Sequence, residues 1–100
     1  MLPPTSERLR DPETVPYFLW DLGMTVGEMC RVLASDDRAR RDEVVVRLLR
    51  EANTRDVWLF VDWATIEEAW DRVAHRLGRS APVWRMLREY HRRHDAATAG

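Results

Sequence analysis

Two histidines near the end of the chain are the residues best placed to bind a metal ion. His91 and His94 lie three residues apart, so a helix would bring both rings to one face. A structural zinc site usually needs four ligands at recognisable spacing, and the other candidate ligands, His75 and Cys30, lie elsewhere in the sequence. We therefore interpret the pair as part of a solvated, arginine-rich helix end and predict no metal ion and no cofactor.

Adjacent carboxylates are the second candidate for chemistry, as a general acid and a general base. The pairs are Asp36/Asp37, Asp42/Glu43 and Glu67/Glu68. Each pair lies in or near the predicted first turns of a helix, where the helix dipole stabilises negative charge. None is embedded in apolar sequence that would raise a pKa for acid–base work. Cys30 lies on a predicted apolar helix face with no histidine nearby in sequence, as an inert thiol would. We identify no catalytic residue and predict that the protein is not an enzyme.

The arginines of the last third of the chain could bind DNA. Residues 66–94 resemble a helix-turn-helix, in which Ala74 and Gly78 have the spacing of the motif's small residue and turn glycine. The second helix would present arginines to phosphates and base edges. The candidate nucleic-acid-binding residues are Arg79, Ser80, Arg85, Arg88 and Arg92. Three features depart from the motif. Trp84 is bulky for its anchor position, Arg79 is charged where the turn usually has an apolar residue, and Pro82 has no N–H to offer a phosphate. DNA binding is therefore the alternative function.

Several aromatic side chains fall outside the apolar stripes that the predicted helices would bury. Trp20, Trp58 and Trp84 each follow a stripe residue by one position, so each should lie at the edge of a stripe or beyond it. Tryptophan and arginine are common anchors of protein interfaces. The candidate partner-binding residues are Tyr17, Phe18, Trp20, Trp58 and Trp84. These aromatics could serve a different protein or a second copy of the chain. The competing interpretation is that the tryptophans pack over one another in an enlarged core.

The length, composition and net charge of the chain are those of one soluble domain. The chain has 100 residues, of which 45% are hydrophobic and 33% charged, and its formal net charge is −1, which predicts no general attraction to nucleic acid. One cysteine allows no internal disulfide, as expected in a reducing compartment. No apolar run is long enough for a signal peptide or a membrane span. We expect a cytoplasmic protein without a membrane partner.

The apolar spacing predicts an all-α, compact bundle of about five short helices with an extended aromatic segment before them. The expected helices cover about 25–34, 37–52, 56–62, 65–78 and 80–95, and residues 57–61 (VWLFV) could instead form a strand. Capping boxes are expected at Thr25 and Thr65, and Gly78 is expected to end a helix. The last helix is expected to bury Val83, Met86, Leu87 and Tyr90. The predicted organisation is a flexible arm (1–15), one helical domain (16–95) and a disordered tail (96–100).

Four short motifs carry a resemblance to a known group of proteins. They are PYFLWD at 16–21, Asp56-Val57-Trp58, Leu77-Gly78-Arg79 and Trp84. Over roughly residues 16–90 the chain resembles small bacterial proteins encoded beside AbiEii-type nucleotidyltransferase toxins. The resemblance implies an antitoxin or accessory partner that binds and neutralises the nucleotidyltransferase. No catalytic residues come with it.

Overall fold

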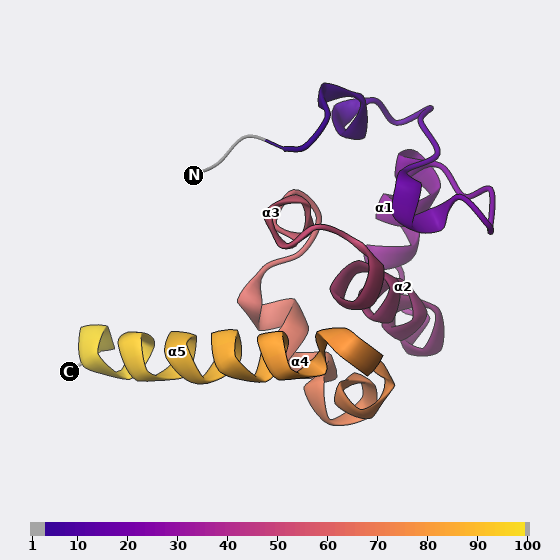
Figure 1. Ribbon diagram of the computed structural model, residues 1–100. Helices are drawn as coiled ribbons and strands as arrows, with labels where there is room; N and C mark the ends of the chain where they lie inside the picture. The colour runs from indigo at the N-terminus through magenta and orange to yellow at the C-terminus, as the bar shows by residue number, and fades with distance from the viewer. Residues whose placement is uncertain (1–3, 100) are drawn as a thin grey trace.

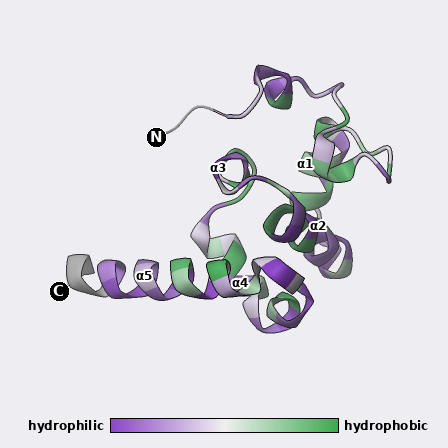
Figure 2. Ribbon diagram, viewed as in Figure 1, coloured by the Kyte–Doolittle hydropathy of each residue, from purple (hydrophilic) through white to green (hydrophobic). Residues whose placement is uncertain are grey.

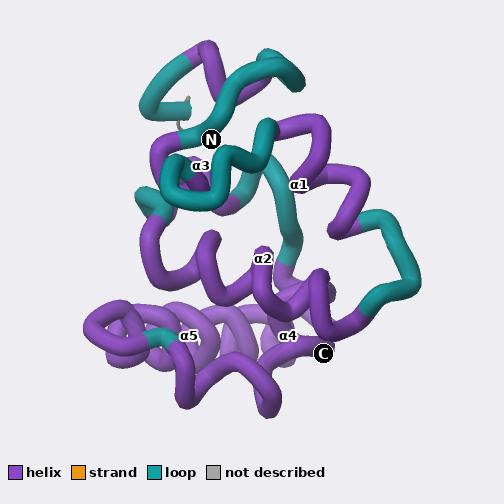
Figure 3. The backbone as a smooth tube through the Cα atoms, turned by 90° about the vertical axis from the view of Figure 1, so that its right-hand side faces the viewer, coloured by secondary structure: helices purple, strands orange, loops and turns teal. Residues whose placement is uncertain are grey.

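Five α-helices and four short 3-10 helices make up the described part of the chain, which contains no strand (Figure 3). The computed structural model describes the backbone of residues 4–99 and the side chains of residues 4–95. The α-helices are α1 (Val26–Leu33), α2 (Arg38–Glu51), α3 (Thr54–Val57), α4 (Trp63–Val73) and α5 (Ala81–Ala99). The 3-10 helices are η1 (Glu7–Arg10), η2 (Tyr17–Leu19), η3 (Ala74–Arg76) and η4 (Gly78–Ser80). The predicted all-α bundle is confirmed.

Helix α2 is the element around which the others pack. It contacts α1, α3, α4, η2 and η4 (Figure 1). Its buried residues are Val44, Val45, Val46, Leu48 and Leu49. Three successive valines lower helix propensity because they branch at Cβ. Neighbours on several sides of α2 bury all three, and burying such a side chain contributes about 1.5–3 kcal/mol, so tertiary packing outweighs local preference.

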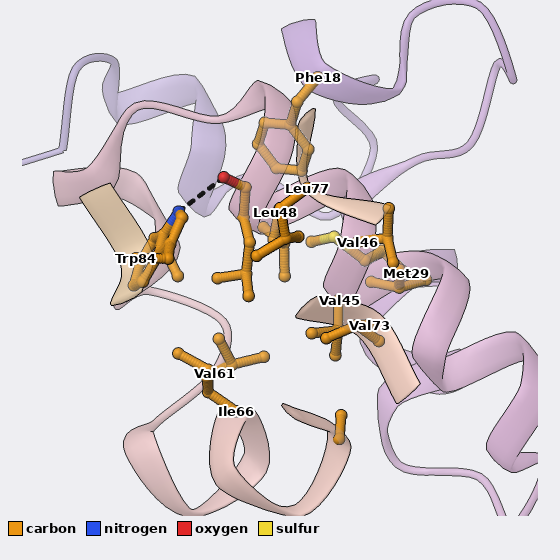
Figure 4. Close-up of a cluster of buried hydrophobic side chains, with 14 of the residues drawn as sticks. Phe18, Met29, Val45, Val46, Leu48, Val61, Ile66, Val73, Leu77 and Trp84 are labelled. Atoms are coloured by element: carbon orange, nitrogen blue, oxygen red, sulfur yellow. Dashed lines mark hydrogen bonds between the residues drawn. The ribbon is translucent and has the colours of Figure 1, made fainter. Parts of the chain in front are cut away.

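The buried side chains form one core shared by distant segments. Figure 4 shows Phe18 from the N-terminal third, Met29 of α1, Leu48 of α2, Ile66 of α4 and Trp84 of α5 around a common centre. No helix of the described residues is both long and apolar enough to cross a membrane.

The starts of two helices follow from local capping signals. At α1 the Thr25 hydroxyl accepts from the Glu28 N–H at 3.1 Å while the Glu28 carboxylate accepts from the Thr25 N–H at 3.3 Å, which confirms the predicted capping box. At α2 the Asp37 carboxylate accepts from the Arg40 N–H. The expected box at Thr65 is wrong. Helix α4 begins two residues earlier, because the Asp62 carboxylate accepts from both the N–H and the hydroxyl of Thr65.

Residues 57–61 form neither the predicted longer helix nor a strand. Asn53 caps the four-residue helix α3, and the chain then turns through 58–60. Val57 and Val61 lie four residues apart and are both buried. The short helix and the residue after the turn therefore each supply a buried apolar side chain to the core, and the turn residues Trp58, Leu59 and Phe60 pack against it.

The predicted flexible arm is packed on the domain where the structure describes it. In residues 4–15 Leu9 is only 3% exposed. The Val26 and Gly27 N–H groups at the start of α1 donate to the Thr14 and Pro12 carbonyls at 2.8 and 2.9 Å. The first N–H groups of a helix have no partner within it, so this segment satisfies two of them. The predicted extended segment at 16–21 is also wrong, since it forms η2 followed by a turn.

Helix α5 runs along one side of the molecule, and its C-terminal half extends beyond the other helices (Figure 1). The hydrophobic residues of α5 lie in its first half, and the described side chains that follow, at 91–95, are hydrophilic (Figure 2). Of the four residues predicted to face the core, Leu87 packs against it, and the prediction is wrong for the other three. Trp84 is 2% exposed, whereas Val83, Met86 and Tyr90 point to solvent. The predicted disordered tail begins within α5, whose backbone is helical to Ala99, while Gly100 and the side chains of 96–99 lie outside the described residues.

Candidate partner-binding site

The structure divides the predicted partner-binding residues between surface and core. Trp20 is 77% exposed and Tyr17 is partly exposed. Phe18 and Trp84 are buried, and Trp58 is half-buried. Trp20 and Tyr17 therefore remain available to a partner. The prediction is wrong for Phe18 and Trp84, whose surfaces the domain itself covers.

Trp58, Trp63 and Trp84 form a tryptophan cluster. Their ring centroids are 5.2 Å apart for Trp58 and Trp63, 5.8 Å for Trp58 and Trp84, and 6.1 Å for Trp63 and Trp84. Such tilted and edge-to-face contacts are the favoured geometry for aromatic pairs. The Trp84 Nε1–H also donates to the Leu49 carbonyl at 2.6 Å (Figure 4). The enlarged-core interpretation is thus correct for this cluster, and it leaves Trp20 as the exposed tryptophan.

Trp20 belongs to an aromatic loop (residues 17–24) that is fixed at its first residue. The Tyr17 hydroxyl donates to Asp56 Oδ2 at 2.6 Å and accepts from the Asn53 N–H at 2.6 Å. Phe18 packs edge-on against Phe60, with ring centroids 5.9 Å apart. These contacts anchor the start of the loop to α3 and the turn after it.

Asp56 is the one charged residue with a fully buried side chain among the described residues, at 0% exposure. Its carboxylate also accepts from the Thr5 N–H at 2.8 Å and the Thr5 hydroxyl at 2.6 Å. Burial alone would raise the pKa of Asp56, but the hydrogen bonds from Thr5 and Tyr17 outweigh it and hold that pKa below its ordinary value. Burial and the bond to Asp56 raise the pKa of Tyr17 to about 12. Asp56 therefore joins the N-terminal segment, the aromatic loop and α3.

An ion pair fixes the middle of the aromatic loop. Arg47 of α2 donates to both carboxylate oxygens of Asp21, at 2.8 and 2.9 Å. The guanidinium of Arg47 lowers the pKa of Asp21. Gly23 then turns the chain with φ +62°, a conformation that suits glycine. With Asp21 held toward α2, the residues on either side of it, Trp20 and Leu22, are left pointing into solvent.

The Asp21–Arg47 pair separates two open hollows. The first, of about 280 Å³, has an apolar lining interrupted by three charged residues. It is lined by Leu19, Leu22, Met24, Val32, Arg40, Glu43, Val44 and Arg47. The second, of about 300 Å³, lies beside Trp20 and is lined by Tyr17, Phe18, Trp20, Asp21, Arg47 and Glu51. Their volumes lie at the lower limit of ligand pockets, which usually occupy 300–1,000 Å³, and their size suits a side chain of another protein.

The predicted nucleic-acid-binding residues are also divided. Arg88 donates to both oxygens of Glu67 at 2.9 and 3.1 Å and lies over the Trp70 ring, 4.8 Å from its centroid. The Ser80 hydroxyl donates to the Leu77 carbonyl. Both are therefore engaged within the domain. Arg79, Arg85 and Arg92 are exposed.

Several of the residues considered for metal binding and acid–base chemistry have structural partners, whereas Cys30, expected on the apolar face of its helix, is exposed. Asp42 and Glu68 accept from Arg72, and Glu43 accepts from Arg76. The His91 ring stacks on Trp63 and the His94 ring on Tyr90. Within the described residues, no three histidine, cysteine or carboxylate side chains gather in a way that could hold a metal ion.

Two features of the site were not recognised in the sequence. The burial of Asp56 is one of them, because a single carboxylate before VWLFV gives no sign of it. The other is the apolar part of the aromatic loop, which Leu22 and Met24 on either side of Gly23 could have indicated. Comparisons of the chain with protein families, with curated proteins and with solved structures found no match.

Proposed function

We propose that this chain is a protein-interaction module that binds its partner through the aromatic loop. The observation that carries the proposal is Trp20, which is 77% exposed on a loop held in place by Asp56 and by Arg47. The other four tryptophans pack within the domain or only partly reach its surface. Tryptophan is the residue type most enriched among interface hot spots.

The anchored loop supports this proposal energetically. Ordering a flexible segment on binding costs free energy. Here η2, the Tyr17–Asp56 bond and the Asp21–Arg47 pair already hold the backbone on either side of Trp20. A partner could therefore cover the indole and place apolar side chains in the two hollows without first ordering the loop.

The resemblance to proteins encoded beside nucleotidyltransferase toxins gives the proposal a specific form. In that form the chain is a cytoplasmic antitoxin or accessory protein that binds a nucleotidyltransferase and covers its active site. The chain would contribute binding surface and no catalytic group.

Replacing Trp20 with alanine tests the proposed surface. We expect Trp20→Ala to weaken binding to an AbiEii-type nucleotidyltransferase by about 30-fold, equivalent to the roughly 2 kcal/mol of a hot-spot residue. Calorimetric titration measures the affinity, and an activity assay measures neutralisation. Val15→Ala, at an exposed valine outside the loop, is the matched control and should bind normally. If the wild-type chain neither binds nor inhibits the enzyme, the antitoxin role is wrong. If it binds and Trp20→Ala binds equally well, the aromatic loop is not the binding surface.

DNA binding is a second candidate because several α5 arginines face outward. The helix-turn-helix resemblance places anchors at 84 and 87, and these residues do face the core. Against it, η3 and η4 replace the continuous helix before the turn, and Arg88 is held by Glu67.

Salt dependence tests the DNA candidate. We expect duplex DNA to bind at about 50 mM salt and to dissociate steeply as salt rises, because phosphate contacts release counterions. Arg85→Ala and Arg92→Ala should each weaken binding, whereas Arg40→Ala, which removes an exposed arginine of α2, should not. Fluorescence anisotropy measures the affinity. Absence of binding at the lower salt concentration would remove this candidate.

A further inference from the structure

The outward face of α5 carries an apolar line directly opposite its buried face. Val83, Met86 and Tyr90 are exposed at 45%, 62% and 57%. They are separated by three and then four residues, the spacing that places side chains along one line of a helix. Trp84 and Arg88 define the opposite face, where they contact α2 and α4. The domain thus leaves one apolar seam of α5 (Val83, Met86 and Tyr90) without a covering element.

Arginines surround this α5 seam and have no carboxylate partner among the described side chains. Arg79 precedes the helix and Arg93 follows the seam, while Arg85 and Arg92 lie farther round the helix, beyond Glu89. None of the four forms an ion pair with a described residue, whereas Arg47, Arg72, Arg76 and Arg88 each pair with a carboxylate. Glu89 is the one acidic residue beside the seam. The seam therefore lies in a positively charged surface.

The charge around the seam indicates which occupant it fits. Arg79 and Arg93 each lie seven residues from Met86. Two copies of α5 packed antiparallel about Met86 would oppose Arg79 of one copy to Arg93 of the other, and a parallel pair would oppose each arginine to its counterpart. Either arrangement sets like charges together, which costs free energy. An acidic partner would instead gain from the same four arginines.

We propose that the α5 seam is a second docking surface, which takes an amphipathic helix of a partner protein with a narrow apolar stripe flanked by carboxylates. A line of three residues has the width of a coiled-coil seam and is narrower than the apolar face of a membrane-surface helix. Phosphates of DNA could pair with the arginines but would leave the apolar residues unused. This docking is independent of the aromatic loop, because it uses different residues on another helix.

A synthetic peptide supplies the probe. It is a helix of about three heptads with leucine at the apolar positions and glutamate on both flanks, so that charge repulsion prevents it from pairing with itself. We expect the full-length chain to bind this peptide, and a peptide with lysine flanks to show no binding. The double variant Met86→Ser with Tyr90→Ser, which keeps the charge unchanged, should weaken binding at least tenfold. Val15→Ser, the matched change at an exposed apolar residue outside α5, should leave it unchanged.

Three results would overturn the proposal. In the first, the acidic peptide does not bind, or the double variant binds it as well as the wild type does. In the second, a peptide with serine in place of leucine binds with the same affinity. Equivalently, duplex DNA displaces the peptide, and the double variant does not change the affinity for DNA. Either observation would show that binding depends on charge alone. In the third, vesicles of anionic phospholipid bind and the peptide does not. Circular dichroism melts of each variant check that the domain is folded. Substitutions at exposed residues should leave its stability nearly unchanged.

Discussion

Trp84→Ala is expected to lower the free energy of unfolding by about 3–5 kcal/mol, the range for removing a buried tryptophan. Trp84 is 2% exposed, and its indole contacts Trp58 and Trp63. The substitution also leaves the Leu49 carbonyl without the N–H that it accepts at 2.6 Å, and an unsatisfied buried group adds to the cost. Such a loss is a large fraction of the roughly 5–15 kcal/mol that stabilise a domain.

Urea unfolding measures the free energy of unfolding of Trp84→Ala and of a control variant, Met86→Ala. Both residues lie on α5, but Met86 is 62% exposed, so its replacement should change stability by less than about 0.5 kcal/mol. The free energy of unfolding of Trp84→Phe should lie between those of the two alanine variants. If Trp84→Ala does not fold, Trp84→Phe should still fold and allow the measurement. A costly Met86→Ala together with a neutral Trp84→Ala would mean that α5 buries the stripe predicted from spacing and not the one described here.

Asp56→Ala is expected to cost about 1.5–3 kcal/mol, because a buried charged acceptor is lost. Thr5 and Tyr17 would both lose the carboxylate that holds the N-terminal segment and the aromatic loop to α3. We therefore expect faster hydrogen exchange at the Val26 and Gly27 N–H groups, which donate to carbonyls of the N-terminal segment. Asp71→Ala, at an exposed carboxylate of α4, is the control and should alter neither measurement.

The pH dependence of the free energy of unfolding separates the contribution of the Asp56 charge from that of its side-chain packing. The folded-state pKa of Asp56 is lowered, so its ionised form stabilises the fold above an ordinary carboxyl pKa of about 4. This stabilisation is lost as the pH falls through the lower, folded-state pKa. The difference in unfolding free energy between the wild type and Asp56→Asn should therefore shrink in acid. An equal difference at pH 7 and in acid would contradict this role.

Tyr17 determines how the stability contributed by the same hydrogen-bonded group changes at alkaline pH. Its folded-state pKa is raised to about 12, above the ordinary value of about 10. The neutral hydroxyl therefore stabilises the fold below about pH 10, and this contribution is lost as the pH rises toward 12.

Helix α5 shows why spacing alone could not select the buried face. Val83, Met86 and Tyr90 satisfy helical spacing, and so do Ala81, Trp84 and Arg88. The first set has the higher hydrophobicity and was predicted to be buried. The second set is inside because the Leu49 carbonyl, Trp63 and Glu67 offer partners to an indole and a guanidinium. Those partners come from α2 and α4, far from α5 in sequence.

Capping shows the opposite case, in which short-range chemistry is sufficient. Thr25 with Glu28, and Asp37, mark the starts of their helices through residues at most three positions away. Gly78 has the expected left-handed conformation but follows η3, because the α-helix predicted over 65–78 ends at Val73. At α4 two capping signals overlap, and Asp62 takes the position expected for Thr65. A local pattern therefore predicts that a helix starts, with an error of a few residues.

The sequence alone determined that this chain is all helical and carries more aromatic side chains than its helical stripes need, because periodicity and caps act within a few residues. Packing between distant elements, which no local pattern encodes, places Trp84 in the core and leaves Trp20, Met86 and Tyr90 outside. Burial depends on which elements lie over a residue, and here those elements come from distant parts of the chain. For the same reason the burial of Asp56 could not be predicted from the sequence, since its partners Thr5 and Tyr17 lie 51 and 39 residues away.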